Sequence, residues 1–535
     1  MQTNLTCGQA LMQLVQSYGI DTVFGMPGVH TLEYYRGIGD TDMHHVMFRH
    51  EQGGGFMADG FARISGRPAA CCVITGPGVT NIATAVGNAY ADSSPMLVLA
   101  STIATMDLSA GRGRLHEITD QLSTISPMTA FSQTLFNGNQ IPSAVAHAFD
   151  LFKSSRPRPV HLELPIDVIG QPANFVPKPS TLTRAPRPDP ASIERAAMLC
   201  SRSKRPVIIA GGGVLDSGTS LVDLAERIGA AVLLTTAAKG IISDTHPLNC
   251  GACLSIPVAH RFIAEADLVI AVGTELSETD LWAPRFLEIS GKLIRIDIDP
   301  ANLSRDLIPD VSVLGDGGAS LDALTASVGA AKSDFTDGRR VREFRESVLT
   351  DIIASERDRR CAKTLDAIRA AIPEDGWLIT DATQIAYLAN TYYPTSHPRS
   401  YTHPSGYCTL GSAMPSAIGA CLGSPTRKGA ALAGDAGLLF TVQELATAVE
   451  ERVGLPVIVW NNDGLAQIKH GMLERDIEPL GVDPRNPDYL QIARGFGAEA
   501  VSPGSVGELT SAIKDAFEAD GPTLIEVKES SDYLQ

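Results

Sequence analysis

The stretch GAALAGDAGLLFTVQELATAVEERVGLPVIVWNNDG, residues 429–464, decides the fold. It holds two short apolar runs, 429–434 and 456–460, which are typical of strands buried in a parallel sheet. Residues 442–448 between them are predicted to be helical. Because parallel strands need a crossover connection, the three segments form one βαβ unit. The polar residues that follow each strand should therefore meet at the carboxyl edge of the sheet, where α/β proteins bind ligands.

Two of these polar residues predict a metal site. Asn462 follows Asp435 by 27 residues, the length of one such crossover. A carboxylate, an amide oxygen and a backbone carbonyl form a partial shell of oxygen ligands that suits Mg²⁺. Gly437, at a helix start, would let backbone N–H groups face a diphosphate. Each turn alone is more often an ordinary strand-to-helix turn or β-turn, but the pair at this spacing favours a metal and diphosphate site.

The same alternation of short apolar runs and amphipathic stretches continues along the whole chain, which predicts α/β layers with parallel sheets. The proline-rich segment near 170–192 and the polar segment near 330–340 are predicted to be linkers. We therefore predict an α/β chain of three doubly wound parallel-sheet domains at 1–170, 190–330 and 350–535. The expected strands are 21–25, 70–75, 96–100 and 160–164, then 206–213, 267–273 and 293–298, then 377–380, 429–434 and 456–460.

Composition limits the partners and the compartment. The 535 residues carry a formal net charge of −17, which argues against binding to nucleic acid or to an anionic membrane surface. No run reaches the ~20 apolar residues of a membrane helix. The nine cysteines are an odd number and no disulfide framework is needed, so we expect a reducing cytoplasm. Cys250 and Cys253 form a CxxC without two further ligands nearby and read as structural.

Gly434-Asp435-Ala436 with Asn461-Asn462 resembles the diphosphate and metal motif of the thiamine diphosphate enzymes of the acetolactate synthase and pyruvate decarboxylase type. The resemblance covers essentially the whole chain, in the order pyrimidine-binding, central and diphosphate-binding domain. It implies that the chain binds thiamine diphosphate and Mg²⁺. Asp435, Asn462 and the backbone oxygen of Gly464 would hold the metal. The cofactor-binding residues of this motif would be Gly434, Asp435, Ala436, Gly437, Asn462, Gly464 and Leu465.

The catalytic glutamate of that family matches Glu51, in Phe48-Arg-His-Glu-Gln-Gly-Gly-Gly55. The chemistry needs a carboxyl group that exchanges a proton with N1′ of the pyrimidine. The cofactor then forms a C2 ylid, which attacks a 2-oxo acid and becomes an enamine after CO₂ leaves. Taken alone, a Glu after Arg and His is more often an exposed, ion-paired helix residue. The flanking pattern and the remote metal motif favour the catalytic interpretation.

Further positions are carried over from the resemblance one at a time. Leu410 would be the apolar wedge under the cofactor, and the carbonyl of Cys408 would accept its amino group. A His that often follows the diphosphate-contacting turn in acetolactate synthases is Ile385 here. The family builds each site from two subunits, so we expect a homodimer at least and a homotetramer by analogy with many relatives. The remaining cofactor contacts implied are Gly28, Val29, Thr75, Asn81, Thr383 and Gln384.

The loop Gly113-Arg-Leu-His116-Glu-Ile-Thr-Asp-Gln121 departs from the AFQE-like stretch of the acetolactate synthases. A His here is similar to those of the 2-oxo acid decarboxylases, where imidazole can protonate the enamine. Val29 offers no proton donor. The catalytic candidates besides Glu51 are therefore His116, His30 and Gln121, although a lone His is more often a bystander.

The stretch 27–37, with 115–117 and 460–463, looks most like the 2-ketoarginine (5-guanidino-2-oxopentanoate) decarboxylases of this family. The guanidinium of such a substrate needs a carboxylate partner. The sequence leaves four candidates open, Glu117, Asp120, Asp463 and Glu474. Acidic residues near 474–483 are more often simply a solvated helix face.

Several alternatives remain. An acetolactate synthase-like carboligase acting on pyruvate is the second hypothesis. A non-catalytic cofactor-binding paralogue is the third, which the intact Glu51, Asp435 and Asn462 disfavour. A nicotinamide dehydrogenase is suggested only by parallel sheets and a glycine run, and the dinucleotide fingerprint is missing. Gly211-Gly212-Gly213 could face a phosphate of FAD, but the run alone is a weak signal and we expect no FAD.

Overall fold

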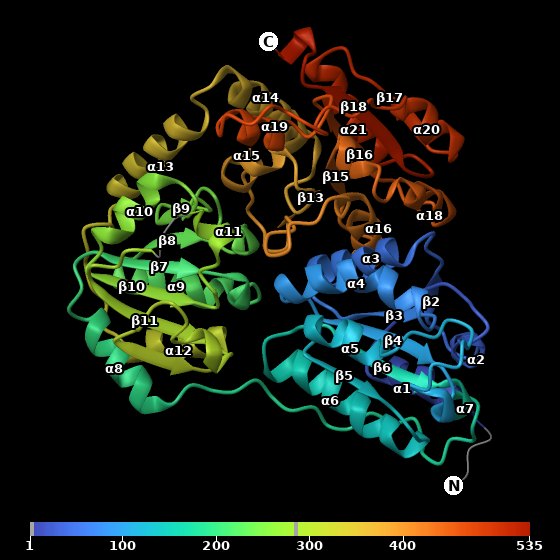
Figure 1. Ribbon diagram of the computed structural model, residues 1–535. Coiled ribbons are helices and arrows are strands. Elements are labelled where there is room, and N and C mark those ends of the chain that lie inside the picture. The colour runs from blue at the N-terminus through green and yellow to red at the C-terminus, as the bar shows by residue number, and fades with distance from the viewer. Residues whose placement is uncertain (1–4, 283–286, 535) are drawn as a thin grey trace.

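The computed structural model describes residues 5–282 and 287–534. It holds three six-stranded sheets, one after another along the chain, with flanking helices (Figure 1). Neighbouring strands pair in parallel throughout. Alternate residues of one strand enter different cores, as Cys71 and Cys72 do, so both faces of the first sheet are covered. The predicted α/β fold with three doubly wound parallel sheets is confirmed.

The first sheet has the strand order β2-β1-β3-β4-β6-β5. Its strands are β1 (Thr22–Gly25), β2 (His44–Val46), β3 (Ala69–Val73), β4 (Met96–Thr102), β5 (Phe131–Thr134) and β6 (Val160–Pro165). The helices of this part are α1 (Cys7–Ser17), α2 (Leu32–Gly39), α3 (Glu51–Ser65), α4 (Pro77–Ala91), α5 (Gln121–Ile125), α6 (Ile141–Ser154) and α7 (Ile166–Ile169).

The second sheet has the order β12-β11-β10-β7-β8-β9 and lies to the left in Figure 1. Its strands are β7 (Pro206–Ala210), β8 (Ala231–Leu234), β9 (Asn249–Gly251), β10 (Leu268–Val272), β11 (Lys292–Asp297) and β12 (Val311–Leu314). Its helices are α8 (Pro190–Cys200), α9 (Gly218–Ile228), α10 (Pro257–Ala264), α11 (Glu278–Leu281) and α12 (Gly317–Ser327).

The third sheet has the order β14-β13-β15-β16-β18-β17. Its strands are β13 (Trp377–Thr380), β14 (Tyr401–Thr402), β15 (Gly429–Gly434), β16 (Pro456–Asn461), β17 (Glu499–Val501) and β18 (Thr523–Lys528). Helix α13 (Arg339–Ile352) packs on the core of the second sheet. The helices of the third part are α14 (Glu356–Ala371), α15 (Gln384–Tyr392), α16 (Ala413–Gly423), α17 (Asp435–Leu438), α18 (Leu445–Glu450), α19 (Ala466–Leu473), α20 (Tyr489–Gly495) and α21 (Val506–Ala516). The predicted helix at 442–448 is a 3₁₀ turn, Val442–Glu444, that continues into α18.

The first and third parts share one hydrophobic core, which joins α3 to α16 (Figure 1). The two helices approach closely at glycines. A Cβ on Gly60 would overlap the backbone of Ser416, and a Cβ on Gly419 would overlap the backbone of Met57. The small residues of α3 therefore serve close packing between helices that are far apart in sequence.

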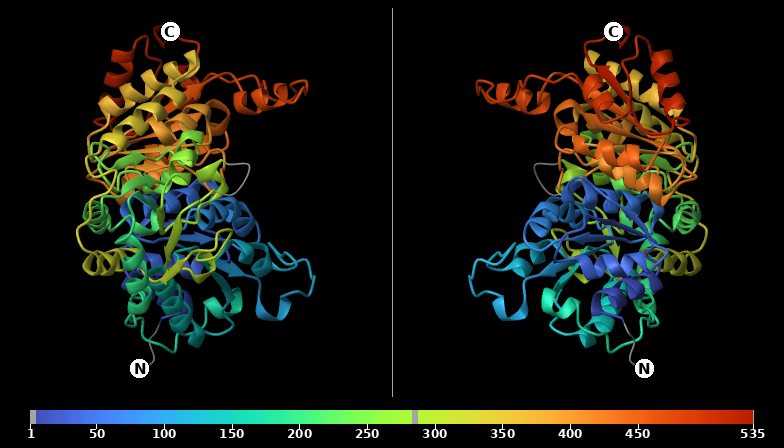
Figure 2. Two further views of the ribbon diagram at one scale, coloured as in Figure 1. Left: turned by 90° about the vertical axis from the view of Figure 1, so that its left-hand side faces the viewer. Right: turned by 90° about the vertical axis from the view of Figure 1, so that its right-hand side faces the viewer.

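Two segments project from the same side of the molecule (Figure 2). One, blue to cyan, is the loop before α5, where Met106 and Leu115 are exposed. The other, orange to red, contains α19, which has no buried residue and is followed by exposed Ile477 and Leu480. Within the part of the chain that the structure describes, no helix combines the length and apolar character needed to cross a membrane.

Candidate active site

The expected metal ligands lie at the carboxyl ends of β15 and β16, which are neighbours with Gly434 opposite Trp460. Asp435 is buried, and its Oδ2 accepts hydrogen bonds from the backbone N–H of Gly464 at 3.0 Å and from Asn486 at 2.7 Å. Asn462 donates its Nδ2 to Oε1 of Gln384 at 3.1 Å. The sequence prediction that Asp435, Asn462 and Gly464 converge is consistent with this geometry.

The oxygen of Asn462 shows that these residues fit a metal ion. Its Oδ1 is buried and has no hydrogen-bond partner among the residues described. A buried amide oxygen without a partner is costly unless a ligand satisfies it. Within residues 5–282 and 287–534, no three His, Cys, Asp or Glu side chains are grouped as metal ligands. A metal here would thus use a mixed set of carboxylate, amide and carbonyl oxygens, which Mg²⁺ accepts.

Two residues behind Asp435 were missed by the sequence analysis. Asn486 donates to Asp435 and also to Oδ1 of Asn461 at 3.0 Å. The Tyr489 hydroxyl donates to the backbone oxygen of Asp435 at 3.0 Å. The only signal was Asn486-Pro-Asp-Tyr489, which reads as an ordinary turn before a helix. These contacts fix the orientation of the Asp435 carboxylate.

The predicted diphosphate-contacting turn lies beside this cluster. Gln384, at the start of α15, links Asn462 to Gln467 of α19, to which it donates at 3.1 Å. A Cβ on Gly434 would lie 2.9 Å from Oγ1 of Thr383, so the turn and the end of β15 are in direct contact. Ile385 is buried in the core and contributes no polar group. Thr383 and Gln384 therefore lie in direct contact with Gly434 and Asn462 of the predicted metal and diphosphate site.

The segment that contains Cys408 and Leu410 is held by hydrogen bonds to Asp381 and Thr441. The Asp381 carboxylate accepts the N–H of Gly411 at 2.8 Å, and the Thr441 hydroxyl donates to the Gly411 oxygen at 2.7 Å. Burial raises the pKa of Asp381 to about 6. Cys408 adopts a left-handed φ of 53°. The two bonds to Gly411 fix the segment in which Leu410 would act as a wedge.

Glu51 is the first residue of α3 and is 9% exposed. Its Oε2 accepts a hydrogen bond from Asn81 of α4 at 2.9 Å. The alternative interpretation of Glu51 as an exposed, ion-paired residue is not supported, because the side chain is buried. The structure thus brings together two predicted site residues, Glu51 and Asn81, from two neighbouring helices.

The two histidines singled out from the sequence are in contact. The ring centroids of His30 and His116 are 5.4 Å apart with an interplanar angle of 88°. His30 Nδ1 lies 3.0 Å from Oγ1 of Thr75, which also contacts Ser101. Burial, followed by repulsion from His116, lowers the pKa of His30. Near them, Val29 is exposed, and a Cβ on Gly28 would overlap Ile74.

Gln121 is buried, and both the oxygen and the nitrogen of its side-chain amide form hydrogen bonds. Its Oε1 accepts the N–H of Gly76 at 2.7 Å, and its Nε2 donates to Ser101 and to the Glu163 carboxylate at 2.6 Å. These bonds hold the turn between β3 and α4. The catalytic role expected for Gln121 stays a prediction.

The four acidic residues that could bind the guanidinium of a substrate differ in the hydrogen bonds and ion pairs that they already form. Glu117 accepts the backbone N–H groups of Arg112 and Arg114, which lowers its pKa. Asp120 caps α5 at Ser123, and Glu474 pairs with His470 at 3.1 Å. The exposed Asp463 carboxylate has no hydrogen bond or ion pair with any described residue.

The predicted site residues fall into two groups. Within the described ranges, no hydrogen bond or ion pair joins one group to the other. The first group, in the N-terminal part, contains Glu51, Asn81, Thr75, His30 and His116. The second, in the C-terminal part, contains Asp435, Asn462, Gly464, Thr383 and Gln384.

Two backbone N–H groups of the glycine run 211–213 are already used within the second part. The N–H of Gly211 donates to the Val272 oxygen at 2.9 Å, and that of Gly213 donates to the Gly273 oxygen at 3.0 Å. These two groups are satisfied at the edge of the sheet, so neither is free to face a phosphate.

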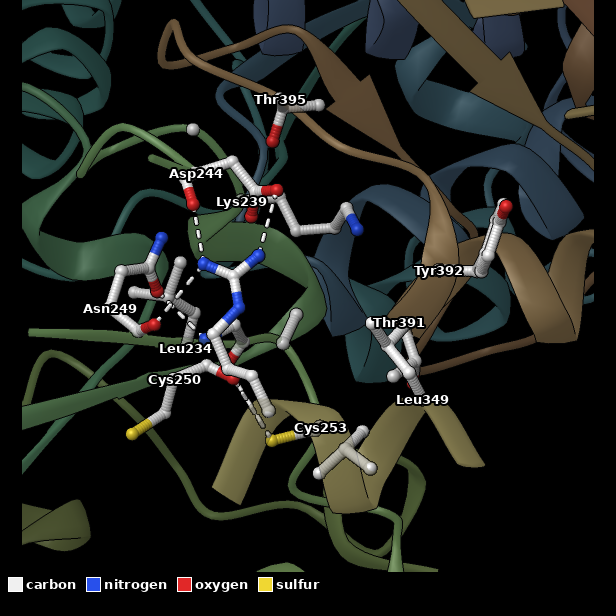
Figure 3. Close-up of a pocket in the computed structure, with 15 residues that line it drawn as sticks. Leu234, Lys239, Asp244, Asn249, Cys250, Cys253, Leu349, Thr391, Tyr392 and Thr395 are labelled. Carbon is white, nitrogen blue, oxygen red and sulfur yellow. Dashed lines mark hydrogen bonds and ion pairs between the residues drawn. The ribbon is translucent and has the colours of Figure 1, made fainter. Parts of the chain in front are cut away.

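A small cavity lies near Cys250 and Cys253, and polar side chains that line it form contacts within the protein (Figure 3). Its volume is about 50 Å³, room for little more than water. Arg345 pairs with Asp244, and buried Lys239 donates to the last carbonyls of α15. Burial raises the pKa of Cys253 to about 12, which favours the neutral thiol.

Comparison with known proteins supplies the family. The chain matches the model described as "Thiamine pyrophosphate enzyme, N-terminal TPP binding domain" over residues 5–124. It matches the central domain of these enzymes over 193–324 and their C-terminal TPP binding domain over 381–527. The three matches fall one on each of the three sheets in chain order, although the first ends before β5 and the third begins just after β13.

Individual relatives cover almost the whole chain. A probable 2-ketoarginine decarboxylase of Pseudomonas aeruginosa is 45% identical over 99% of this chain and 95% of its own length. A probable acetolactate synthase large subunit of Methanocaldococcus jannaschii is 30% identical over 97% of this chain and 91% of its own. The acetolactate synthase isozyme 1 large subunit of Escherichia coli is 28% identical over 98% and 94%.

Proposed function

This chain belongs to the thiamine pyrophosphate enzymes, and we propose from that premise that it is a thiamine diphosphate- and Mg²⁺-dependent decarboxylase of 2-oxo acids. The observation that carries the choice of a decarboxylase is the contact between His30 and His116. Imidazole groups can deliver the proton that must replace CO₂ on the substrate carbon. The 45% identity to a 2-ketoarginine decarboxylase supports the same reaction.

The cofactor residues follow from the geometry of the C-terminal part. Asp435, the free Oδ1 of Asn462 and the backbone oxygen of Gly464 would hold Mg²⁺. The start of α17 at Gly437, with Thr383 and Gln384, would face the diphosphate. Bound thiamine diphosphate supplies a carbon nucleophile that stores the electron pair left by departing CO₂.

Two residues of the N-terminal part would manage the proton at the pyrimidine. Glu51 holds that proton on its carboxyl group, in a buried site at a helix start. Asn81 keeps the carboxyl in place through the 2.9 Å bond to Oε2. Its donor amide leaves the other carboxyl oxygen available.

His30 and His116 would act next to the substrate carbon. Contact with Thr75 occupies Nδ1 of His30 and leaves its Nε2 to hold or deliver a proton. The lowered pKa of His30 makes its protonated form a stronger acid than an ordinary imidazolium, so it gives up its proton more readily. Thr75 and Ser101, together with Gln121, would fix the position of the ring.

We propose 2-ketoarginine as the substrate and Asp463 as the partner of its guanidinium. The relative's name supports the substrate. The free Asp463 carboxylate, one residue after Asn462, supports the assignment of the partner. A bidentate pair with a carboxylate is the usual way to select a guanidinium.

We propose a homodimer at least, and a homotetramer by analogy with the family. The separation of the site residues into two unconnected groups supports a site shared by two chains. The two segments that project on the same side carry exposed Leu115 and Leu480, which a second copy would cover (Figure 2). The nine free cysteines support a reducing compartment such as the cytoplasm.

The test is CO₂ release with saturating thiamine diphosphate and Mg²⁺, with 2-ketoarginine and pyruvate as separate substrates. Fast release from 2-ketoarginine and little from pyruvate is the expected result. The acetolactate synthase relatives favour a second candidate, a carboligase. Preference for pyruvate with acetolactate as the product would establish that activity and contradict the decarboxylase.

A further inference from the structure

Glu444 connects the third part of the chain to the start of α3. It is fully buried at the end of the 3₁₀ turn Val442–Glu444, nine residues after Asp435. Its Oε1 accepts the backbone N–H of His50 at 2.9 Å. Its Oε2 accepts that of Arg49 at 3.0 Å. The next residue in the chain, Glu51, begins the helix.

Two further features shape this contact. The Thr447 hydroxyl donates to Oε2 of Glu444 at 2.8 Å. A Cβ on Gly53 would overlap the Glu444 carboxyl group, so only glycine leaves room for it. Helix starts carry N–H groups without partners inside the helix, and these are usually satisfied by the same chain segment. Here a carboxylate some four hundred residues away provides the acceptor.

We propose that Glu444 is a positioning residue for Glu51, which fixes the direction of that carboxyl group by holding the backbone just before α3. This inference rests on the proposed function of Glu51. A displacement of a reacting group by about 1 Å can cost roughly a hundredfold in rate, so a fixed backbone at this point matters. The same short segment carries Asp435, so the metal loop and the proton-holding helix are anchored to each other within one chain.

The surroundings of Glu444 supply hydrogen-bond donors to both of its carboxyl oxygens. Burial raises its pKa, while the N–H groups of Arg49 and His50 and the Thr447 hydroxyl oppose that shift. The nearby Arg49 guanidinium adds attraction and pairs with Glu450 on the surface.

Glu444→Gln tests the proposal, since it keeps the length of the side chain but turns one acceptor into a donor that faces N–H groups. The first readout is hydrogen–deuterium exchange at C2 of bound thiamine diphosphate, which needs no substrate. We expect this exchange to slow by about tenfold to a hundredfold. The cofactor Kd, from tryptophan fluorescence, should change less than about twofold, since the metal and diphosphate residues are untouched.

The matched control is Glu450→Gln, which removes a negative charge that contacts the side chain of Arg49 instead of its backbone. It should leave C2 exchange unchanged. Amide exchange by mass spectrometry should show faster exchange at Arg49 and His50 in Glu444→Gln only. If these amides exchange faster while C2 exchange keeps its wild-type rate, Glu444 does not position Glu51 and the proposal is overturned.

A second variant guards against a folding defect. Gly53→Ala leaves Glu444 intact but displaces its carboxyl group. It should slow C2 exchange in a protein that keeps the wild-type melting temperature within a few degrees. Wild-type C2 exchange in this variant contradicts the proposal. Failure of the wild type to release CO₂ from any 2-oxo acid would refute the proposed function alone, because C2 exchange reports on Glu444 without it.

Discussion

The imidazole rings of His30 and His116 are 5.4 Å apart and nearly perpendicular, although 86 residues separate them in the chain. The left-handed backbone of His116, with φ of 63°, turns its ring toward His30. The turn before α4 keeps this arrangement in place, because a Cβ on Gly76 would overlap the backbone oxygen of His116. The pair is thus built from two loops at the carboxyl end of one sheet.

Replacement of His116 with Gln should raise the pKa of His30. Burial lowers that pKa first and repulsion from His116 lowers it further, so removal of the second cause shifts it part of the way back. If His30 acts as the proton donor, the basic limb of the kcat profile against pH moves to higher pH. The profile with 2-ketoarginine checks this. An unchanged limb would mean that His30 does not govern it.

Glu51→Gln should lower kcat by about a hundredfold or more, since general acid–base catalysis contributes roughly that much. Binding of thiamine diphosphate should be retained, because the amide keeps the size of the side chain and the diphosphate residues lie in another domain. Steady-state kinetics and fluorescence titration of the cofactor measure the two effects. Retention of most of the activity would disprove the assigned role.

Asn462→Ala should weaken Mg²⁺ binding by about tenfold to a hundredfold, because it removes the unpartnered Oδ1 together with the bond to Gln384. We expect the variant to lose activity at low Mg²⁺ and to recover it at high Mg²⁺. Asn461→Ala is a useful comparison, since Asn461 contacts Glu526 and Asn486. If Asn462→Ala has wild-type Mg²⁺ dependence, the metal lies elsewhere.

Asp463→Asn should raise the KM for 2-ketoarginine by about tenfold or more, the effect of losing one charged hydrogen bond of about 1.5–3 kcal/mol. KM for an uncharged 2-oxo acid of similar length should not rise. Glu474→Gln, at a carboxylate already paired with His470, is the matched control. A rise in KM only in the control would move the guanidinium site to Glu474.

Much of the site was predictable because it depends on local pattern and strand order. The polar residues after β15 and β16 meet because adjacent parallel strands end at one edge, and Glu51 begins α3 as expected. Eight of the eighteen strands described were not predicted. Some, such as β2 and β17, have partly exposed side chains and lack an apolar run. Others, such as β8 and β18, are buried and were missed because a short apolar run cannot be told from a buried helical segment by periodicity. Asn486, Tyr489 and Glu444 could not be inferred, because their roles come from contacts between distant segments.

The shared core of α3 and α16 also affects the chain while it is being made. Buried residues of the first and third sheets belong to one cluster, with Phe61 and Ile418 among its members, whereas the second sheet has its own cluster. The packing of α3 against α16 therefore couples the first and third sheets, although they are far apart in sequence. Each of these two sheets also has a separate core cluster on its other face. During synthesis, the N-terminal part must expose the apolar surface of α3 until the last third of the chain is made and covers it.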